Sequence, residues 1–346
     1  MTNPTSFGTL PGGETAYLYT LRNSSGMSVT VSDFGGIITN VVVPDKNGVF
    51  ADVVLAHDNF GRYLENPSSF GALIGRNANR INGAKLIIDD VTHFLPDTGG
   101  GNNAHGGPRG LSRRLFSAVM DSGDDGEYLT LSITIPHMDD GFPGELKLDT
   151  TYTLTKDNTL VINYSARADR STIINLTNHS YFNLAGHSSG NIHDQTLWID
   201  SDFYAANLPD GTSMGGIRAV CGTPLDFRIG KPIGQGISDE CHGKDADGYN
   251  HFLFLNGTGY RRFAKMSDPR SGRVMEVFTD TPGVQIYSAN NMPLPRVDKD
   301  GANYKPHQGM ALETQFCPNS PNLPWLVSPI CQHLDSTTAF KFSVDK

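Results

Sequence analysis

Alternation of apolar and polar residues is the feature that most restricts what this chain can fold into. The alternation is clearest in residues 129–135, 146–154 and 160–164. In the second segment, Leu146 and Leu148 would face one side of an extended chain, whereas the lysine and aspartate that follow them would face the other. Because successive side chains of a strand point to opposite faces, a period of two residues is typical of half-buried antiparallel strands.

The rest of the chain carries the same signal in shorter segments. Strands are also expected at residues 28–32, 37–43, 86–88, 252–255, 274–279, 284–288 and 339–344. Turn-forming residues such as Asp45-Lys46-Asn47-Gly48 separate the segments, and no stretch repeats apolar residues at helical spacing. The sequence therefore predicts an all-β fold, a single large domain over residues 1–346, with antiparallel sheets stacked as a β-sandwich.

The charge of the chain restricts its partners. The sequence has 36 acidic and 27 basic residues, a formal net charge of -9, and the acidic residues are scattered. This balance argues against a nucleic acid or an anionic membrane as partner. No apolar run approaches the roughly 18 residues of a membrane helix. The N-terminal residues lack a basic segment followed by an apolar one, so we expect a cytoplasmic protein.

Signals for metals and cofactors are weak. The four cysteines, Cys221, Cys241, Cys317 and Cys331, are widely spaced, so buried thiols are expected rather than a disulfide framework or a zinc site. No close group of histidines and carboxylates has metal-ligand spacing. The glycine run at 99–101 does not lie between a strand and a helix, as a dinucleotide fingerprint requires. We therefore expect no cofactor.

Two otherwise uncharged runs each contain one residue that can exchange a proton near neutral pH. His179 lies within residues 175–184, and Glu313 lies within residues 311–315. An imidazole can donate a proton near neutral pH, and an ionised carboxylate can accept one. Apolar neighbours flank Glu313, so we expect a partly dry site that raises its basicity. The alternative for either residue is a hydrogen-bonded structural role.

Further polar candidates lie in glycine-rich and arginine-rich segments. The two glycines after His105 allow close approach of the backbone and leave its imidazole accessible. Arg76 and Arg80 bracket a short segment, and an arginine there could bind hydroxyls or a carboxylate. A surface ion pair is the alternative.

These residues belong to an ordered set of motifs that runs nearly from end to end. The set comprises Gly75-Arg76, Asn79-Arg80-Ile81, His105-Gly106-Gly107, Gly141-Phe142-Pro143-Gly144, the run 175–184, Thr223-Pro224-Leu225-Asp226-Phe227-Arg228, Pro282-Gly283-Val284-Gln285 and Leu312-Glu313-Thr314-Gln315. The glycine-rich pieces are weak signals when taken singly, but the ordered set is highly specific. With it, the chain resembles the aldose 1-epimerases, also called galactose mutarotases.

The resemblance implies a fold, an activity and a set of site residues. The fold would be a large β-supersandwich with the sugar in an open cleft. His179 would be the general acid and Glu313 the general base. Tyr181 follows His179 by two residues, so it would point the same way along a strand and line the cleft. The implied substrate-binding residues are Asn79, Arg80, His105, Tyr181, Asn250 and Gln285.

One position departs from the family pattern. Where the family usually has Gly-aromatic-Asp-His, this chain has Gly248-Tyr249-Asn250-His251. The amide of Asn250 can still bond to hydroxyls, but it lacks the charge of aspartate. Three hypotheses therefore stay open: an isomerase that interconverts the anomers of a free hexose such as galactose or glucose, a related isomerase or cyclase for another hemiacetal, and a non-catalytic sugar-binding protein. A monomer or homodimer is expected.

Overall fold

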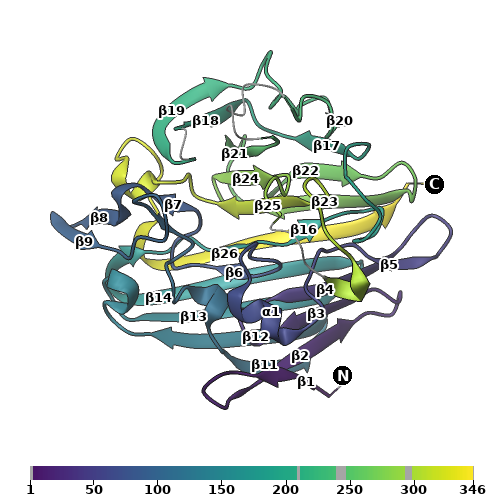
Figure 1. Ribbon diagram of the computed structural model, residues 1–346, viewed down its shortest axis with the longest axis horizontal. Helices are drawn as coiled ribbons and strands as arrows, with labels where there is room; N and C mark the ends of the chain where they lie inside the picture. Colours follow the sequence, from purple (N-terminus) through teal and green to yellow (C-terminus); the bar gives the residue numbers. More distant parts are fainter. Residues whose placement is uncertain (1–2, 209–210, 239–246, 293–297, 346) are drawn as a thin grey trace.

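The computed structural model describes residues 3–208, 211–238, 247–292 and 298–345 (Figure 1). It confirms the all-β prediction: large antiparallel sheets dominate, and the described part of the chain contains a single short α-helix, α1 (Phe60–Glu65). Short 3₁₀ turns lie at Asn82–Ala84, Leu111–Arg113, Asp139–Gly141, Lys299–Gly301 and Ser320–Asn322. No helix in the described ranges is long and apolar enough to cross a membrane.

The largest sheet has nine strands and follows from the alternating segments. In spatial order they are β11 (Ser117–Ser122), β12 (Gly126–Ile135), β13 (Leu146–Thr155), β14 (Thr159–Ile173), β26 (Ile330–Val344), β23 (Arg273–Thr279), β22 (Arg261–Ser267), β17 (Thr196–Ile199) and β20 (Lys231–Pro232). Leu148 is paired with Ile133 on one side and Ala166 on the other. Every second residue of β13, starting from Leu146, is buried and the residues that alternate with them are exposed or half-buried, so the period of two residues is realised as predicted.

The second-largest sheet has six strands. Its order is β16 (Tyr181–Phe182), β25 (Met310–Gln315), β24 (Gly283–Tyr287), β21 (Asn250–Phe254), β18 (Phe203–Asn207) and β19 (Ser213–Ala219). Glu313 is directly opposite Gln285, which is opposite Phe252 on the next strand. Opposed residues of neighbouring strands share a face of the sheet, so this register places Glu313 and Gln285 side by side.

Smaller sheets complete the architecture. Five strands run in sequence order: β1 (Thr5–Thr9), β2 (Thr15–Arg22), β3 (Ser28–Ser32), β4 (Ile38–Pro44) and β5 (Phe50–Asp52). Two-stranded pairs join β6 (Leu73–Ile74) to β15 (Thr177–Asn178), β7 (Arg80–Ile81) to β10 (Asn103–Ala104), and β8 (Lys85–Ile88) to β9 (Val91–Phe94). One apolar core contains residues of all three large sheets, among them Val41, Tyr152 and Ile286.

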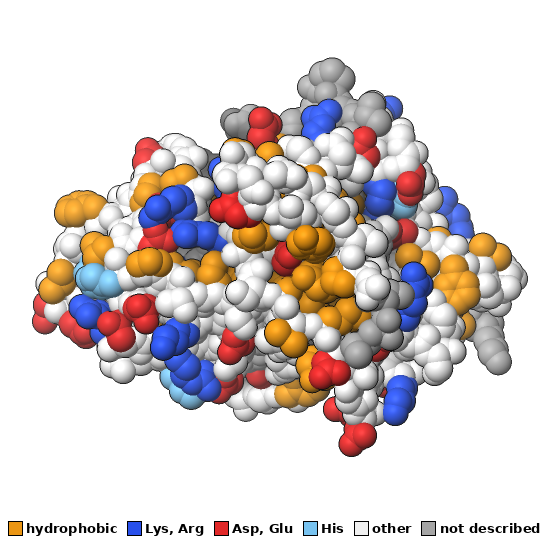
Figure 2. Space-filling model, turned by 90° about the horizontal axis from the view of Figure 1, so that it is seen from below, with side chains coloured by type: hydrophobic (Ala, Val, Ile, Leu, Met, Phe, Trp, Pro, Cys, Tyr) orange, Lys and Arg blue, Asp and Glu red, His pale blue; other side chains and the backbone are white. Residues whose placement is uncertain are grey.

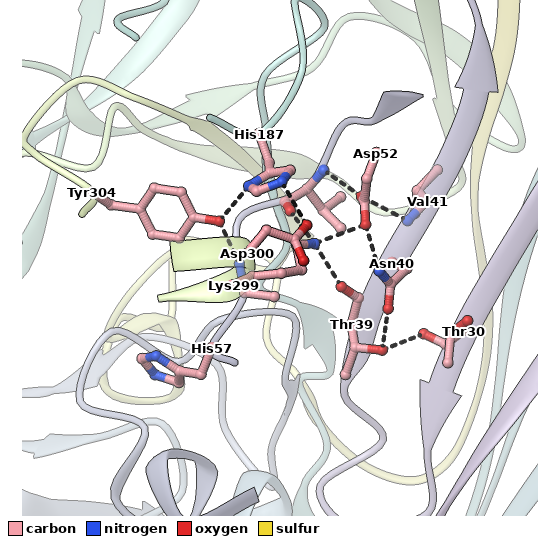
Figure 3. A network of polar contacts seen from close by, with 12 residues as sticks. Thr30, Thr39, Asn40, Val41, Asp52, His57, His187, Lys299, Asp300 and Tyr304 are labelled. Atoms are coloured by element: carbon pink, nitrogen blue, oxygen red, sulfur yellow. Dashed lines mark hydrogen bonds and ion pairs between the residues drawn. The ribbon is translucent and has the colours of Figure 1, made fainter. Parts of the chain in front are cut away.

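A buried polar network fixes the segment around Lys299 to the N-terminal part of the chain (Figure 3). The ammonium of Lys299 donates to the carbonyls of Thr39 (2.9 Å) and Val54 (2.8 Å) and to the carboxylate of Asp52 (2.8 Å). Three acceptors match the three N–H bonds of the ammonium, which satisfies a charge that is buried from water. The residue after Val54 donates its N–H to the carbonyl of Tyr181 (3.0 Å), so the network also supports the backbone of β16.

The surface and the cysteines test two further expectations. Acidic and basic side chains are intermixed over the face shown in Figure 2. Cys317 is buried as predicted and Cys331 is half-buried, but Cys221 is exposed, so the prediction of a buried thiol is wrong there. Cys221 lies in a turn after β19, and its side chain is open to solvent. Cys241 lies outside the described residues.

Candidate active site

His179 is held in a short gap between β15 and β16. Its N–H donates to the carbonyl of Ala72 (2.9 Å), and its carbonyl accepts from the N–H of Gly71 (3.1 Å). The asparagines of this run also bond to the backbone: the Asn178 amide donates to the Gly71 carbonyl (2.9 Å) and accepts from the Ser180 N–H (3.1 Å). An uncharged, amide-rich sequence therefore supplies partners for the backbone polar groups of this buried, irregular segment.

Glu313 lies in the middle of β25, where every residue is buried. Its side chain is about as enclosed as that of an apolar core residue, with a relative exposure of 3%. The prediction of a partly dry site for this carboxylate is confirmed. Because β25 pairs with β24 on one side and β16 on the other, the fold brings the Glu313 strand next to the segment that carries His179.

The two side chains face each other. The distance between Nε2 of His179 and Oε1 of Glu313 is 3.5 Å. Nδ1 of His179 and Oε2 of Glu313 are buried, and neither has a hydrogen-bond partner among the described residues. A buried polar atom without a partner costs on the order of 1–3 kcal/mol. Two such atoms on neighbouring residues indicate a site that a polar ligand completes.

Burial shifts the two pKa values in opposite directions. Burial raises the pKa of Glu313 to about 8, against the opposing effect of the positive charge on Arg80. Burial lowers the pKa of His179 to about 3, and the nearby His105 acts in the same direction. A low dielectric disfavours both the Glu313 carboxylate and the His179 imidazolium. The pair therefore holds one proton at neutral pH, and the favoured form is a protonated Glu313 beside a neutral His179. The shifts are opposite to those that would pre-form a carboxylate and an imidazolium.

His105 and Asn79 are joined by reciprocal backbone contacts beside the β7–β10 pair. His105 adopts a left-handed conformation (φ 52°), its N–H donates to the Asn79 carbonyl (3.1 Å), and its Nδ1 accepts from the Asn79 N–H (3.4 Å). Burial lowers the pKa of His105 to about 4, so its imidazole is neutral. Since Nδ1 is the acceptor, the proton is on Nε2, which is then a hydrogen-bond donor. The side-chain oxygen of Asn79 accepts from the Arg80 N–H (2.8 Å).

Gly106 explains why glycine follows His105. Its φ is +82°, and a Cβ atom there would lie 2.0 Å from the carbonyl oxygen of Gly75. Any side chain would therefore push the two loops apart and move His105 away from His179.

Arg80 supplies positive charge to the site. It opens β7 opposite Ala104, and within the described chain its guanidinium forms no ion pair with a carboxylate. Its positive charge acts on Glu313: it lowers the pKa of that carboxyl group, whereas burial raises it. The surface ion pair considered as an alternative is therefore not seen in the part of the protein that the structure describes. Arg76, by contrast, is buried and donates to the carbonyls of Pro143 and Gly144, which is a structural role.

Gln285 and Asn250 form a neighbouring amide pair. The Gln285 Nε2 donates to the Asn250 Oδ1 (2.7 Å), and the Gln285 Oε1 is buried without a partner in the described residues. The Asn250 carbonyl accepts from the side chain of Asn207 (2.9 Å), a supporting residue that the sequence did not single out. The side-chain oxygen of Asn250 therefore already accepts a hydrogen bond within the protein. The NH₂ group of Asn250 occupies the place where an aspartate would have its second carboxylate oxygen.

Tyr181 does not have the expected placement. His179 and Tyr181 do not share a continuous strand, because β15 pairs with β6 and β16 pairs with β25. The ring of Tyr181 is buried and stacks on the imidazole, and its hydroxyl donates to the carbonyl of Ser68 (2.9 Å). The hydroxyl therefore points into the protein.

Tyr287, which the sequence analysis missed, is edge-on to the same imidazole. It lies two residues after Gln285 on one strand, so its side chain shares a face with Gln285, and this spacing could have identified it from the sequence.

The arrangement suits proton exchange on one small molecule. Two titratable groups share a proton, and the surrounding groups are neutral amides, a neutral imidazole and one arginine. No group of three or more histidine, cysteine or acidic residues in the described ranges could hold a metal ion.

Comparisons with known proteins agree over nearly the full chain. The family model for aldose 1-epimerase matches residues 17–337. The chain is 38% identical to galactose mutarotase from Bos taurus, over 98% of this chain and 97% of that protein. It is 32% identical to aldose 1-epimerase from Escherichia coli, over 96% of each. Among solved structures, an aldose epimerase homologue from C. elegans superposes with a TM-score of 0.86 at 28% identity, over 96% of this chain and 100% of that one.

Proposed function

The chain belongs to the aldose 1-epimerase family of isomerases, and from that premise we propose that it interconverts the α and β anomers of a free hexose. The observation that carries the proposal is the buried pair of His179 and Glu313, 3.5 Å apart, each with a polar atom that lacks a partner in the described chain. Such a pair can take a proton from one oxygen of a substrate and give one to another.

The proposed reaction opens and recloses the sugar ring. The Glu313 carboxylate accepts the proton of the C1 hydroxyl while the His179 imidazolium donates a proton to the ring oxygen. The bond between C1 and the ring oxygen breaks, and C1 becomes the carbonyl carbon of the open-chain aldehyde. After rotation about the C1–C2 bond, the same transfers in reverse close the ring on the other face. Each positioned acid or base contributes on the order of 10²–10⁴ in rate.

The position of the shared proton follows this cycle. The protonated acid and neutral imidazole that burial favours correspond to the open-chain stage. The cyclic sugar requires the carboxylate and imidazolium, which hold the same total of one proton. Arg80 lowers the pKa of Glu313, and sugar hydroxyls would donate to the carboxylate, so substrate binding favours the charged form. The enzyme therefore needs to move one proton within the pair and none from solvent.

The groups around the pair are proposed to bind the sugar hydroxyls. Arg80 and the Nε2–H of His105 would donate, and the free Oε1 of Gln285 would accept. Asn250 would donate through its NH₂ group, since Gln285 occupies its oxygen. For Asn79, the main contribution is to hold His105 and Arg80, because its own carbonyl and side-chain oxygen bond to their N–H groups.

Galactose and glucose are the proposed substrates, because relatives that match at full length are galactose mutarotases. Polarimetry of freshly dissolved α-D-galactose and α-D-glucose tests this directly. The protein should speed the approach to anomeric equilibrium well beyond the rate in buffer. Equal rates with and without the protein, for both sugars, would contradict the proposal.

Asn250 favours a second candidate, an isomerase or cyclase for another cyclic hemiacetal. A neutral amide in place of the family's usual aspartate forms weaker bonds to hydroxyls, which suits a substrate with fewer hydroxyls. The intact His179–Glu313 pair argues against the third hypothesis, a non-catalytic sugar-binding protein.

A further inference from the structure

The orientation of the His179 ring needs an explanation. In most catalytic or metal-binding histidines, a hydrogen bond to the second ring nitrogen fixes the tautomer and the ring plane. Here Nε2 faces Glu313, and Nδ1 is buried without a hydrogen-bond partner in the described chain. The backbone of His179 is fixed by Gly71 and Ala72, but those bonds do not restrain rotation of the ring. Some other contact must hold the imidazole.

Three aromatic rings enclose the imidazole, and one of them lies against its face. Tyr181 stacks on His179 with ring centroids 4.9 Å apart and an angle of 29° between the planes. His105 and Tyr287 approach edge-on, with centroids 5.6 Å and 6.4 Å away. Stacked and edge-on arrangements at these distances are the favoured geometries of aromatic pairs. The stack determines the plane of the imidazole, and the two edges limit its rotation within that plane.

Tyr181 is itself fixed at both ends. Its hydroxyl donates to the carbonyl of Ser68 (2.9 Å), and Phe70 packs edge-on against its ring at 5.3 Å. Its backbone pairs with Ala311 of β25, the strand that carries Glu313 two residues later. The ring below His179 is thus attached to the same strand as the carboxylate that His179 faces. Because Tyr181 is attached to β25, its ring keeps the His179 imidazole at a fixed position relative to the Glu313 carboxylate.

We infer that Tyr181 is a positioning residue for His179: its ring sets the plane of the imidazole and supports the positive charge that His179 carries when it acts as an acid. A cation above the face of an aromatic ring is attracted by the negative charge density of that face. The stack therefore opposes the burial that disfavours the imidazolium. This role rests on the proposed function, and it replaces the role in substrate binding that the sequence suggested.

Two substitutions in β16 distinguish a loss of His179 positioning from a general loss of protein stability. Tyr181→Leu removes the ring that stacks on His179, whereas Phe182→Leu removes the adjacent buried ring, which points to the other side and packs on Phe340 (centroids 5.0 Å apart). Both changes create a cavity in the same strand. We expect kcat to fall about 10–100-fold in Tyr181→Leu with KM within about twofold, because a small misplacement of an acid reduces rate far more than binding. In Phe182→Leu, kcat should stay within about twofold.

Tyr181→Phe is the conservative rescue. It retains the ring and loses only the bond to Ser68, so its kcat should stay within about threefold of the wild type. If Tyr181→Leu does not fold, Tyr181→Met provides a similar volume without a ring and takes its place. Equal losses of kcat in Tyr181→Leu and Phe182→Leu would overturn the inference, as would a Tyr181→Phe variant as impaired as Tyr181→Leu.

A spectroscopic readout distinguishes this inference from the proposed function. In ¹⁵N-histidine-labelled protein, the His179 nitrogen resonances should move in Tyr181→Leu, because an imidazole without a fixed plane no longer presents one tautomer to Glu313, and they should be unchanged in Phe182→Leu. This measurement does not depend on any sugar. Unchanged His179 resonances in Tyr181→Leu would refute the positioning role even in an active enzyme. A wild type without mutarotase activity would instead contradict the proposed function.

Discussion

Nε2 of His179 lies 3.5 Å from Oε1 of Glu313, with both side chains almost fully buried. The contact joins a residue in an irregular gap between two short strands to a residue in the middle of a regular one. It also couples their ionisation, because a proton on either group changes the charge that the other experiences.

Loss of either member of the pair should nearly abolish activity. For His179→Gln and Glu313→Ala, we expect kcat/KM to fall at least about 10²-fold, because each change removes one proton-transfer group. Polarimetry gives the rates, and circular dichroism checks that the variants fold. His333→Gln, an exposed histidine on β26, is the matched control and should be fully active. Near wild-type rates in a folded His179→Gln or Glu313→Ala variant would show that the assigned mechanism is wrong.

The pH dependence of kcat/KM should show a wide plateau. Burial places the pKa of Glu313 at about 8 and that of His179 at about 3, so the pair holds one proton between these values. Above about pH 8 the pair loses the proton that the ring oxygen must receive, and kcat/KM should fall about tenfold per pH unit. Below about pH 3 no base remains. A rate that stays constant from pH 7 to pH 10, with the fold intact, would contradict this assignment.

The same shifts predict how stability depends on pH. The raised pKa of Glu313 contributes stability that is complete below its ordinary 4.5 and is lost as pH rises through about 8. The lowered pKa of His179 contributes stability that is complete above 6.5 and is lost as pH falls through about 3. The two slopes cancel between pH 4.5 and 6.5.

Glu313→Gln tests the alkaline side of this stability profile. The glutamine cannot ionise, so at pH 9 the variant should exceed the wild type in free energy of unfolding by more than about 1.4 kcal/mol, the equivalent of one pKa unit. Urea unfolding at pH 5 and pH 9 measures the difference, which should be larger at pH 9. A difference independent of pH would refute the raised pKa. Stabilisation with loss of activity is the expected trade-off at a strained site.

Asn250→Asp should strengthen the binding of hexose. The carboxylate can still accept from the Gln285 Nε2, and it offers a charged acceptor where the NH₂ group was. A charge-assisted bond exceeds a neutral one by roughly 1 kcal/mol, so KM for galactose or glucose should fall about fivefold with little change in kcat. Asn163→Asp, on the exposed side of β14, adds the same charge elsewhere and should have no effect. If neither wild type nor Asn250→Asp acts on hexoses, the second candidate function is preferred.

Activity should survive exhaustive chelation. The proposed chemistry uses only proton transfers between protein groups and the sugar, and needs neither a Lewis acid nor a nucleotide. Polarimetry before and after dialysis against EDTA should give the same rate. Loss of activity that one specific metal restores would contradict this expectation.

Much of the fold was predictable from local patterns. Every strand expected from the sequence overlaps an observed one: residues 28–32 coincide with β3, and residues 339–344 form the end of β26. The first half of β26 was missed, because it pairs with the irregular part of β14 and its exposed residues do not alternate regularly. Alternation of apolar and polar residues indicates a strand with one buried face. A strand that is buried on both faces, or exposed on both, lacks this pattern and is not detected by it.

The two residues proposed to transfer protons could also be singled out from the sequence. A lone histidine and a lone glutamate in uncharged runs limited the choice, and the motif order identified the family. The sequence could not determine the state of these groups or the role of Tyr181. Both depend on contacts between segments far apart in the chain: the sheet register places Glu313 against the imidazole, and β16 turns the Tyr181 hydroxyl toward Ser68. Solvent exclusion and ring stacking arise only when those segments pack together, so only the tertiary structure decides how far burial shifts the two pKa values and which ring lies against the imidazole.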